Sequence, residues 1–363
     1  MRVHRHAGLA GFLTTVVAAV AAPASAAYAA PSSVVVHPGQ SIQAAIDAAP
    51  AYGRVLVDAG TYAENLLVTK PLELRGRGSV RIVPPAEMAA NRCTEDEDAD
   101  LPDGGLLPVG ICVLGVLGGP VDPTGDLPSV IEPVSDVHLV GLEVAGFAEG
   151  VETDGTDGLV LSDLTLRDNE DGIDSFYGTG TVFERVRATG STGYGAAALQ
   201  RSRDVRVTDS HFEGNAGFGL SLVDTRGAAV TGSTFAGNAG GLAVTDTPAG
   251  ERSGDLLFSG NTITDNDGFF AGDGDAPPFS GIGIAVLGAE DTRISGNLVR
   301  DNAPTGDAPF SGFGIGIFDA GDLTGGESAH DVHVSGNRIT GSPVPVLDAS
   351  ASGDNIIRGN RLG

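Results

Sequence analysis

Residues 205–223 read VRVTDSHFEGNAGFGLSLV, and residues 228–245 repeat the phrase as AAVTGSTFAGNAGGLAVT. Each copy holds an apolar pair, a corner of small or polar residues, a second apolar pair, a Gly-Asn step, and then apolar residues in alternation. The corner recurs every 22–24 residues, or at longer intervals where loops are inserted, at Leu142, Leu164, Val186, Ser210, Ser233, Asn261, Asn297, Asn337 and Asn360. This period predicts a solenoid of stacked coils.

Alternation within each coil predicts which side chains face the core. In the first of the two quoted coils the inward residues are Val205, Val207, Phe212, Leu220 and Leu222. Strands of successive coils then pair in parallel, about 4.8 Å apart, and parallel crossovers are right-handed by default. The sequence therefore predicts an all-β chain, a right-handed parallel β-helix of about 10–12 coils.

Aligning the coils also predicts two columns of asparagines. One consists of Asn261, Asn297, Asn337 and Asn360, and the other of Asn169, Asn215, Asn238, Asn266 and Asn302. Amides stacked at strand spacing can hydrogen-bond along the column, and asparagine tolerates the backbone of a tight corner. We expect these asparagines to be structural.

The first 30 residues are typical of a secretory signal peptide. Arg2 and Arg5 precede an apolar stretch at 7–22, and small residues follow at 24–29. The apolar stretch is too short for a membrane span, and no other segment is long enough. We expect residues 31–363 to form a single secreted, extracellular domain.

The net charge of the chain restricts the classes of partner that it can bind. There are 21 Lys and Arg against 47 Asp and Glu, a formal net charge of −26. This balance argues against nucleic acid and anionic membranes as partners. Acidic polysaccharides would also be repelled unless a basic groove or bridging cations intervened.

Two features interrupt the coils near the N-terminus. Residues 41–49 place apolar side chains on one helical face, with Gln40 or Ser41 as N-cap, and predict a short helix that covers the open end of the stack. Residues 84–133 lose the pattern and read as a long excursion containing Cys93 and Cys112, within which residues 111–113 could rejoin the coil. In a secreted protein the two cysteines are expected to form a disulfide, with a reactive thiol as the alternative.

A family resemblance adds to this interpretation. The segments SIQAAIDAA at 41–49, GTYAENL at 60–66 and KPLELRG at 70–76 resemble the opening of pectin-lyase-like right-handed parallel β-helix proteins. The resemblance extends over nearly the whole chain after the leader and implies the fold. It implies little about activity, because this fold hosts lyases, hydrolases, esterases, epimerases and non-enzymatic surface proteins. The short catalytic signatures of its well-known enzymes are absent, as are tryptophan and every lysine except Lys70.

One outward column carries the candidate chemistry. The aligned coils give it as Glu152, Asp174, Ala197, Ser221, Ala243, Ala285 and Gly316. Glu152 and Asp174, one coil apart, would raise one pKa and could serve as acid and as base or nucleophile. Tyr177, Tyr194 and Arg201 lie on neighbouring turns and suit sugar rings and acidic sugars. Two solvated acids on an acidic protein are the alternative interpretation.

Loop insertions at 267–280, 303–311 and 320–330 lengthen three coils. Residues 273–284 and 307–315 are near copies, so we expect Phe279 and Phe310 to form an apolar wall beside the small residues of the column. Four acidic residues in and just before the first of these loops could bind Ca²⁺, the only cofactor that the sequence suggests, or could be solvated acids: Asp265, Asp267, Asp273 and Asp275.

These features predict a secreted β-helix protein that binds an extracellular polysaccharide. If the protein is an enzyme, we expect it to cleave that polysaccharide. An enzyme of this kind would be a polysaccharide lyase or a glycoside hydrolase. The alternative is a non-catalytic surface or adhesion module that presents loops on a β-helix scaffold. In one form of this alternative, adhesion depends on Ca²⁺.

Overall fold

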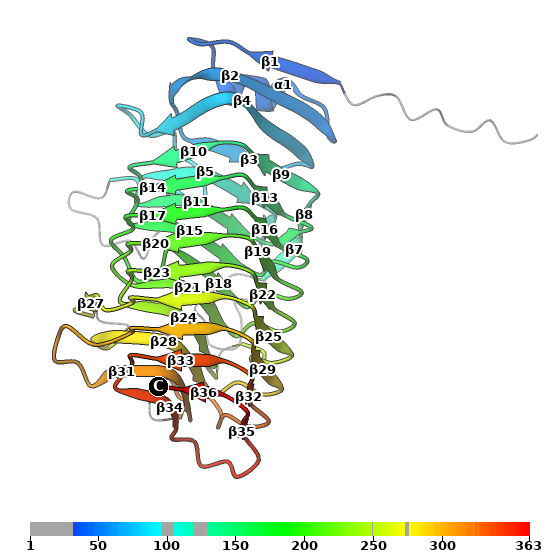
Figure 1. Ribbon diagram of the computed structural model, residues 1–363. Helices are drawn as coiled ribbons and strands as arrows, with labels where there is room; N and C mark the ends of the chain where they lie inside the picture. The colour runs from blue at the N-terminus through cyan, green and yellow to red at the C-terminus, as the bar shows by residue number, and fades with distance from the viewer. Residues whose placement is uncertain (1–31, 96–104, 119–128, 249, 273–275, 322) are drawn as a thin grey trace, which may run out of the picture. The chain divides into compact units, whose positions relative to one another are not determined.

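The computed structural model describes residues 32–95, 105–118, 129–248, 250–272, 276–321 and 323–363, so the leader lies outside the described residues. Residues 31–363 form one compact unit. Its strands stack coil on coil from the N-terminal to the C-terminal end (Figure 1). No helix of the described residues is long and apolar enough to cross a membrane.

Each coil contributes strands to three rows, and the first two rows join at the corner into one sheet. The first row contains β1 (Ser33–Val36), β2 (Gly53–Ala63), β4 (Leu72–Val83), β9 (Val137–Val140), β13 (Val160–Ser162), β16 (Val182–Glu184), β19 (Arg206–Thr208), β22 (Ala229–Thr231), β25 (Leu256–Ser259), β29 (Thr292–Ser295), β32 (His333–Ser335) and β35 (Ile356–Arg358). The second row begins with the later halves of β2 and β4 and continues through β10 (Glu143–Ala145), β14 (Thr165–Arg167), β17 (Arg187–Thr189), β20 (His211–Glu213), β23 (Thr234–Ala236), β26 (Thr262–Thr264), β30 (Leu298–Arg300), β33 (Arg338–Thr340) and β36 (Arg361–Leu362).

The third row is a separate sheet, which we call the site sheet because it carries the candidate column. It contains β3 (Leu66–Val68), β5 (Val109–Leu114), β11 (Glu149–Asp154), β15 (Asp171–Phe176), β18 (Ala197–Gln200), β21 (Phe218–Val223), β24 (Gly240–Thr245), β28 (Phe279–Leu287), β31 (Phe310–Phe318) and β34 (Val344–Asp348). A short strand, β27 (Phe269–Phe270), pairs with β28 in the antiparallel sense. Two small pairs lie outside these rows: β6 (Val116–Leu117) with β7 (Val130–Glu132), and β8 (Val134–Ser135) with β12 (Thr156–Asp157).

The core runs through the middle of the coils, as the alternation predicts. Val205, Val207, Phe212, Leu220 and Leu222 are all buried. Phe212 pairs in register with Phe235 of the next coil, and their rings stack with centroids 5.2 Å apart and planes within 6°. Stacked rings at strand spacing fill the core and also fix the register of successive coils.

The asparagine columns form hydrogen-bonded ladders, except that Asn169 stands apart from its column and bonds the backbone at Phe147 and Val144, since Ser191 takes the place of an asparagine in the next coil. Along the chain of Asn215, Asn238, Asn266 and Asn302, each amide Nδ2 and backbone N–H donates to Oδ1 of the next asparagine, over 2.9–3.1 Å. The second column repeats the pattern from Asn261 to Asn360. The structural role predicted for these residues is confirmed by these bonds.

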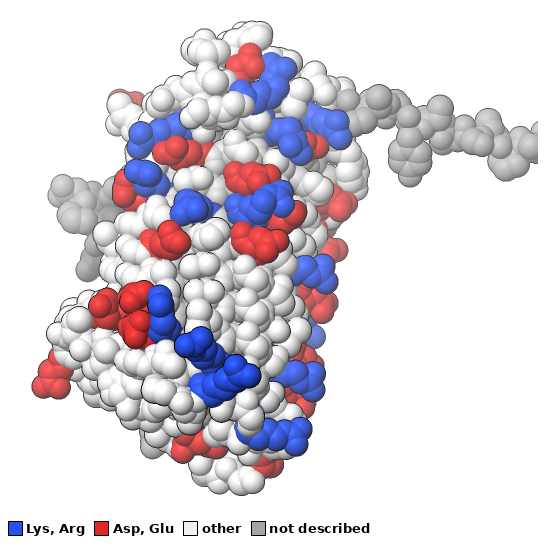
Figure 2. Space-filling view, in the orientation of Figure 1, with Lys and Arg blue, Asp and Glu red and all other residues white. Residues whose placement is uncertain are grey.

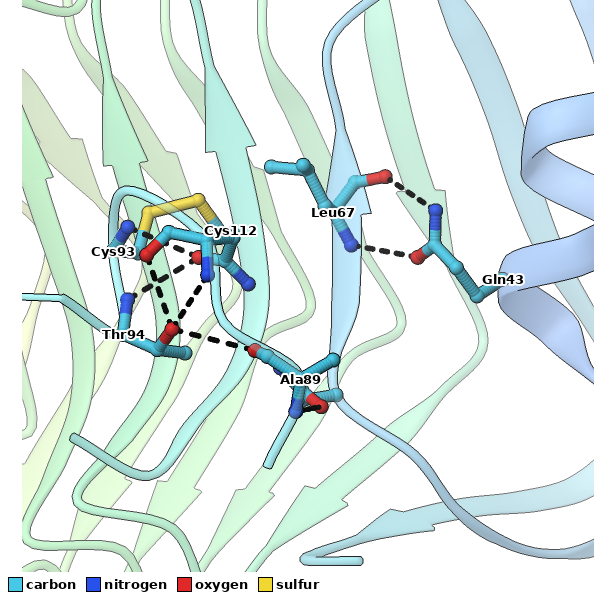
Figure 3. Close-up of a disulfide and its surroundings, with 8 residues drawn as sticks. Gln43, Leu67, Ala89, Cys93, Thr94 and Cys112 are labelled. Atoms are coloured by element: carbon cyan, nitrogen blue, oxygen red, sulfur yellow. Dashed lines mark hydrogen bonds between the residues drawn. A yellow bond between two sulfur atoms is a disulfide. The ribbon is translucent and has the colours of Figure 1, made fainter. Parts of the chain in front are cut away.

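The predicted cap forms as α1 (Ile42–Ala48), with Ser41 as N-cap. Gln43 binds the edge strand β3, since its Oε1 accepts from Leu67 N at 2.8 Å and its Nε2 donates to Leu67 O at 3.2 Å (Figure 3). At the first turn, Glu64 accepts bonds from the backbone N–H groups of Ile42 and Gln43. Lys70 Nζ donates to Ala49 O at the opposite end, so both helix termini have partners of the favourable charge.

Ion pairs lie on the outer surface of the first two rows of strands. Figure 2 shows basic and acidic side chains close together over the N-terminal coils of the face in view. Arg54 and Arg75 both pair with Glu73, at 3.0 and 2.5 Å, and Arg185 pairs with Asp163 at 2.7 Å. Each exposed pair contributes about 0–1 kcal/mol, so the core and the ladders carry most of the stability.

Candidate functional site

The outward column of the site sheet consists of residues that pair directly from coil to coil. The register gives it as Leu67, Cys112, Glu152, Asp174, Ala198, Ser221, Ala243, Ala285, Gly316 and Leu347. Placing Ala197 in it is wrong by one residue, because Ala197 pairs with Ile173 and is buried in the core. Extra residues in the turn before β18 lengthen this coil and shift the strand by one position.

Four carboxyl groups gather at the N-terminal end of this column. Glu152 pairs with Asp174 as expected, and Glu149 pairs with Asp171 three residues earlier. Strict alternation would place Glu149 and Glu152 on opposite faces. However, Gly150 and Val151 are both buried, and a Cβ on Gly150 would lie 2.5 Å from Gly172 O. The glycine therefore allows two consecutive inward positions, and both glutamates remain on the outer side.

These carboxyl groups raise one another's pKa values. Burial, together with the charge of Asp171, raises the pKa of Asp174 to about 7. Burial and the charges of Asp174, Asp171 and Glu152 raise the pKa of Glu149 well above its usual value. A carboxyl group that titrates near neutral pH can both donate and accept a proton, as general acid–base chemistry requires.

The disulfide covers the N-terminal end of the carboxyl cluster. Cys93 and Cys112 are bonded, as predicted, and Cys112 lies directly beside Glu152 in the column. Cys93 Sγ and carboxylate oxygens of Glu152 and Asp154 lie within 4.8 Å of one another. Figure 3 shows how the segment around Cys93 and Thr94 folds back over β5. The excursion therefore shields Glu152 and leaves Asp174 as the first carboxyl group of the open part of the column.

Removing both cysteines, as in Cys93→Ala with Cys112→Ala, should release this cover. The bond closes a 19-residue separation, for which the chain-entropy model gives about 3 kcal/mol. Because the excursion can open without unfolding the coils, we expect rapid cleavage within 84–108 in limited proteolysis and a fall in Tm of only a few degrees. Unreduced wild-type protein is the control, and an unchanged cleavage pattern would contradict the covering role.

A cavity of about 430 Å³ opens on the column beyond Asp174. Its described lining consists of Asp171, Asp174, Tyr194, Gly195, Ala198, Gln200, Phe218, Ser221, Val223, Ala243, Thr245, Ala276, Pro277, Phe279, Leu287, Phe310, Leu323 and Thr324. Small column residues form its floor, and the inserted loops contribute Ala276, Pro277, Phe310, Leu323 and Thr324. The carboxyl groups mark one end, and the Phe-bearing loops mark the other.

The aromatic end is a packed cluster. Tyr194 meets Phe218, Phe270 and Phe279 edge-on, with centroids 5.7–6.0 Å apart. Phe279 and Phe310 pair in register on β28 and β31, which explains why the two loop sequences are near copies. The apolar wall expected from Phe279 and Phe310 therefore lines the cavity.

Comparison with known proteins agrees with this architecture. A family model described as "Right handed beta helix region" matches residues 130–281, while a search of curated proteins finds no match. The periplasmic alginate epimerase AlgG superposes with a TM-score of 0.57 at 14% identity, over 92% of this chain and 84% of that chain. The chain has the right-handed parallel β-helix fold.

Two further solved structures share this fold. The A-module of the Azotobacter vinelandii mannuronan C-5 epimerase AlgE4 has a TM-score of 0.51 and 18% identity, over 89% of this chain and 92% of that chain. Pectate lyase Pel9A has a TM-score of 0.51 and 11% identity, over 92% and 80% of the two chains. At such identities the likeness concerns the fold alone.

Two predicted site residues lie together at another place on the β-helix. Arg201 Nη1 donates to Tyr177 Oη at 3.0 Å, and its guanidinium carbon lies 5.9 Å from the ring centre. Arg201 also lies 4.0 Å from Asp224. Tyr177 faces a second cavity with Thr156 and Thr179. Neither Tyr177 nor Arg201 is among the described lining of the cavity at Asp174.

The proposed Ca²⁺ ligands are only partly described. Asp265 and Asp267 are exposed on either side of buried Asn266, and Asp265 pairs with Arg300 at 3.9 Å. Asp273 and Asp275 lie outside the described residues, so the Ca²⁺ set stays a prediction. Among described residues, a different group, His330, Asp331 and Asp354, brings its ligand atoms within 4.8 Å of one another.

Sequence reasoning missed four residues of the site: Glu149, Asp171, Gln200 and Phe218. Gln200 Nε2 donates to Asp174 Oδ1 at 3.4 Å, and Asp171 Oδ1 accepts from Gly195 N at 3.1 Å. Ser221 lies in the column, as the sequence predicts, and also lines the cavity. The coil-to-coil pairing of Glu149 with Asp171 was the available signal, since both precede a glycine at the same point of the repeat.

Proposed function

We propose that this β-helix protein binds an extracellular polysaccharide in the cavity of the site sheet and cleaves it by hydrolysis. The observation that carries the proposal is the cavity itself, with titratable carboxyl groups at one end and aromatic rings at the other. Aromatic rings suit the apolar faces of sugars, and a pair of carboxyl groups suits acid–base cleavage of a glycosidic bond. Its neighbours in fold, an alginate epimerase and a pectate lyase by name, support a polysaccharide in general.

In this proposal Asp174 is the general acid, because its pKa of about 7 leaves it protonated in part at neutral pH. Glu152 or Asp171 supplies the ionised partner. Glu152 pairs with Asp174 across one strand spacing, whereas Asp171 shares the cavity wall with it. The predicted leader and the disulfide support a location outside the cytoplasm.

The test is a glycan panel assayed for new reducing ends and for unsaturated products. On a responsive glycan we expect Asp174→Asn to lower kcat by about 10²–10⁴-fold, the usual contribution of a positioned acid. Glu152→Gln and Asp171→Asn identify the second carboxyl group by the larger loss. Asp168→Asn, an exposed acid on the corner of the first sheet, is the matched control. Unsaturated products would contradict hydrolysis, and full activity of Asp174→Asn would contradict its role.

The second candidate is a binding module without catalysis. It is favoured by one observation, that the excursion shields Glu152, which is not among the described lining of the cavity. Binding of a glycan from the panel without any product, in wild-type protein, is the result this candidate predicts.

A further inference from the structure

The cavity has a charge that restricts which sugars it can hold. Asp171 and Asp174 are the charged residues of its described lining, which contains no Lys, Arg or His. Glu149 and Glu152 add two carboxyl groups immediately behind them. A sugar carboxylate at this end would meet like charges a few ångströms away and would be repelled. A sugar that carries a positive charge would be attracted by the same groups.

A second observation points to a polar ligand in the same cavity. Ser221 is fully buried beside the space, and its Oγ has no hydrogen-bond partner among the residues that the structure describes. Ser221 follows Ala198 in the column, so it lies two strand spacings, about 10 Å, from Asp174. A buried hydroxyl without a partner is destabilising, and a donor or acceptor of a ligand would relieve this.

The aromatic wall is compatible with a cationic sugar. Tyr194 lies between the carboxyl end and the phenylalanine cluster, and it lines the cavity together with Phe218. Rings at this place can pack on the apolar face of a pyranose, and their electron-rich faces attract a nearby ammonium group.

We propose that the cavity selects a glycan of amino sugars with free amines, placing one ammonium group against Asp171 and a polar group of a neighbouring sugar on Ser221 Oγ. This selectivity rests on the polysaccharide binding proposed above and names its substrate class. It also fits hydrolysis, because elimination requires a carboxyl group next to the proton that is removed, and amino sugars have none there.

Calorimetric titration with three tetrasaccharides tests the selectivity: β-1,4-linked glucosamine, N-acetylglucosamine and mannuronate, each at neutral pH, where Asp174 is about half ionised, in about 0.15 M salt and with EDTA. A charge-assisted hydrogen bond contributes about 1.5–3 kcal/mol, so we expect the glucosamine tetramer to bind about 10–100-fold more tightly than its neutral N-acetylated counterpart. The mannuronate tetramer should bind most weakly.

Two double variants separate local recognition from general attraction to an acidic protein. Asp171→Asn with Asp174→Asn should remove the preference for the amine while neutral binding persists, which also shows that the variant is folded. Asp168→Asn with Asp209→Asn makes the same change in net charge at exposed corners, where asparagine accepts the positive φ of 54° and 49°. This second variant should keep the preference. Ser221→Ala should weaken binding of all three sugars alike.

The outcomes distinguish this inference from the proposed function. A preference for the amine that survives Asp171→Asn with Asp174→Asn would overturn the inference. The inference would also be overturned if the mannuronate tetramer bound most tightly of the three, whether in EDTA or only after Ca²⁺ is added back. Both results would leave polysaccharide binding in place. If the protein binds none of the three tetrasaccharides and no glycan of the wider panel, the proposed function itself is overturned.

Discussion

Replacing Asn238 with alanine is expected to lower the free energy of unfolding by about 3–5 kcal/mol. Asn238 is fully buried, and its Oδ1 accepts bonds from the backbone and the side chain of Asn215 at 3.0 and 2.9 Å. Its Nδ2 donates to Phe212 O and to Asn266 Oδ1. Alanine leaves these donors and acceptors without partners in a place too tightly packed for water, and each such group costs about 1–3 kcal/mol.

Position along the ladder provides the control. Asn360 ends the other ladder, where it makes the same bonds to Asn337 but remains half-buried in the last coil. In Asn360→Ala water can reach the groups that lose their partner, so the loss should be less than half as large. Urea unfolding followed by circular dichroism measures both variants. Equal losses at the two positions would show that the ladders contribute little beyond the packing of the corner.

Asn238→Asp separates hydrogen bonding from shape. Aspartate has nearly the same volume, but its carboxylate cannot donate to Phe212 O or to Asn266 Oδ1. We expect a loss at least as large as with alanine at neutral pH, and a smaller one in acid, where a protonated carboxyl group donates one of the two bonds.

The ladders and the core were predictable because each obeys a rule that repeats in every coil. One asparagine per coil and one large apolar residue per strand leave a periodic signal, and the paired Asn238 and Phe235 occur at the same points as Asn215 and Phe212. The capping helix and the disulfide followed from similarly local patterns. Local and periodic rules therefore sufficed for the fold.

The site depends on departures from those rules. Ala198, not Ala197, stands in the column because extra residues enter one turn, and a one-residue shift exchanges the two faces of a strand. Glu149 joins Glu152 on the outer side because Gly150 interrupts the alternation. The cover over Glu152 arises from a non-repeating excursion. Each of these is a single event in the chain, and periodicity carries no information about single events.

Asp174→Asn is expected to make the protein more stable above neutral pH and to remove part of the pH dependence of stability. The folded pKa of Asp174, about 7, lies above its ordinary value of 3.8, so between these values the folded state binds more protons than the unfolded chain. The free energy of unfolding therefore falls as the pH rises through this window, and the stabilisation is lost above about pH 7. Below pH 4 both states are protonated and this dependence ends.

The amide is nearly isosteric with the carboxyl group and carries no charge at any pH. It keeps an oxygen to accept the bond from Gln200 Nε2 and removes the repulsion from Asp171 and Asp154. Three pKa units correspond to roughly 4 kcal/mol, and the half-buried side chain keeps contact with water, so we expect a gain of about 2 kcal/mol at pH 8. Glu149 and Asp224, whose pKa values are also raised, should retain their own share of the pH dependence in the variant.

Thermal melts of wild-type protein and Asp174→Asn, at intervals from pH 4 to pH 8, give the difference in stability at each pH. That difference should grow with pH up to about 7 and then remain constant, and Asp168→Asn, at an exposed position, is the control measured in parallel. A variant that is less stable than wild type at pH 8 would show that the ionised carboxylate is a structural partner. If instead Asp174→Asn is both more stable and inactive, the wild-type protein keeps an acid at a place where its charge opposes folding, which is the pattern expected of a group retained for chemistry.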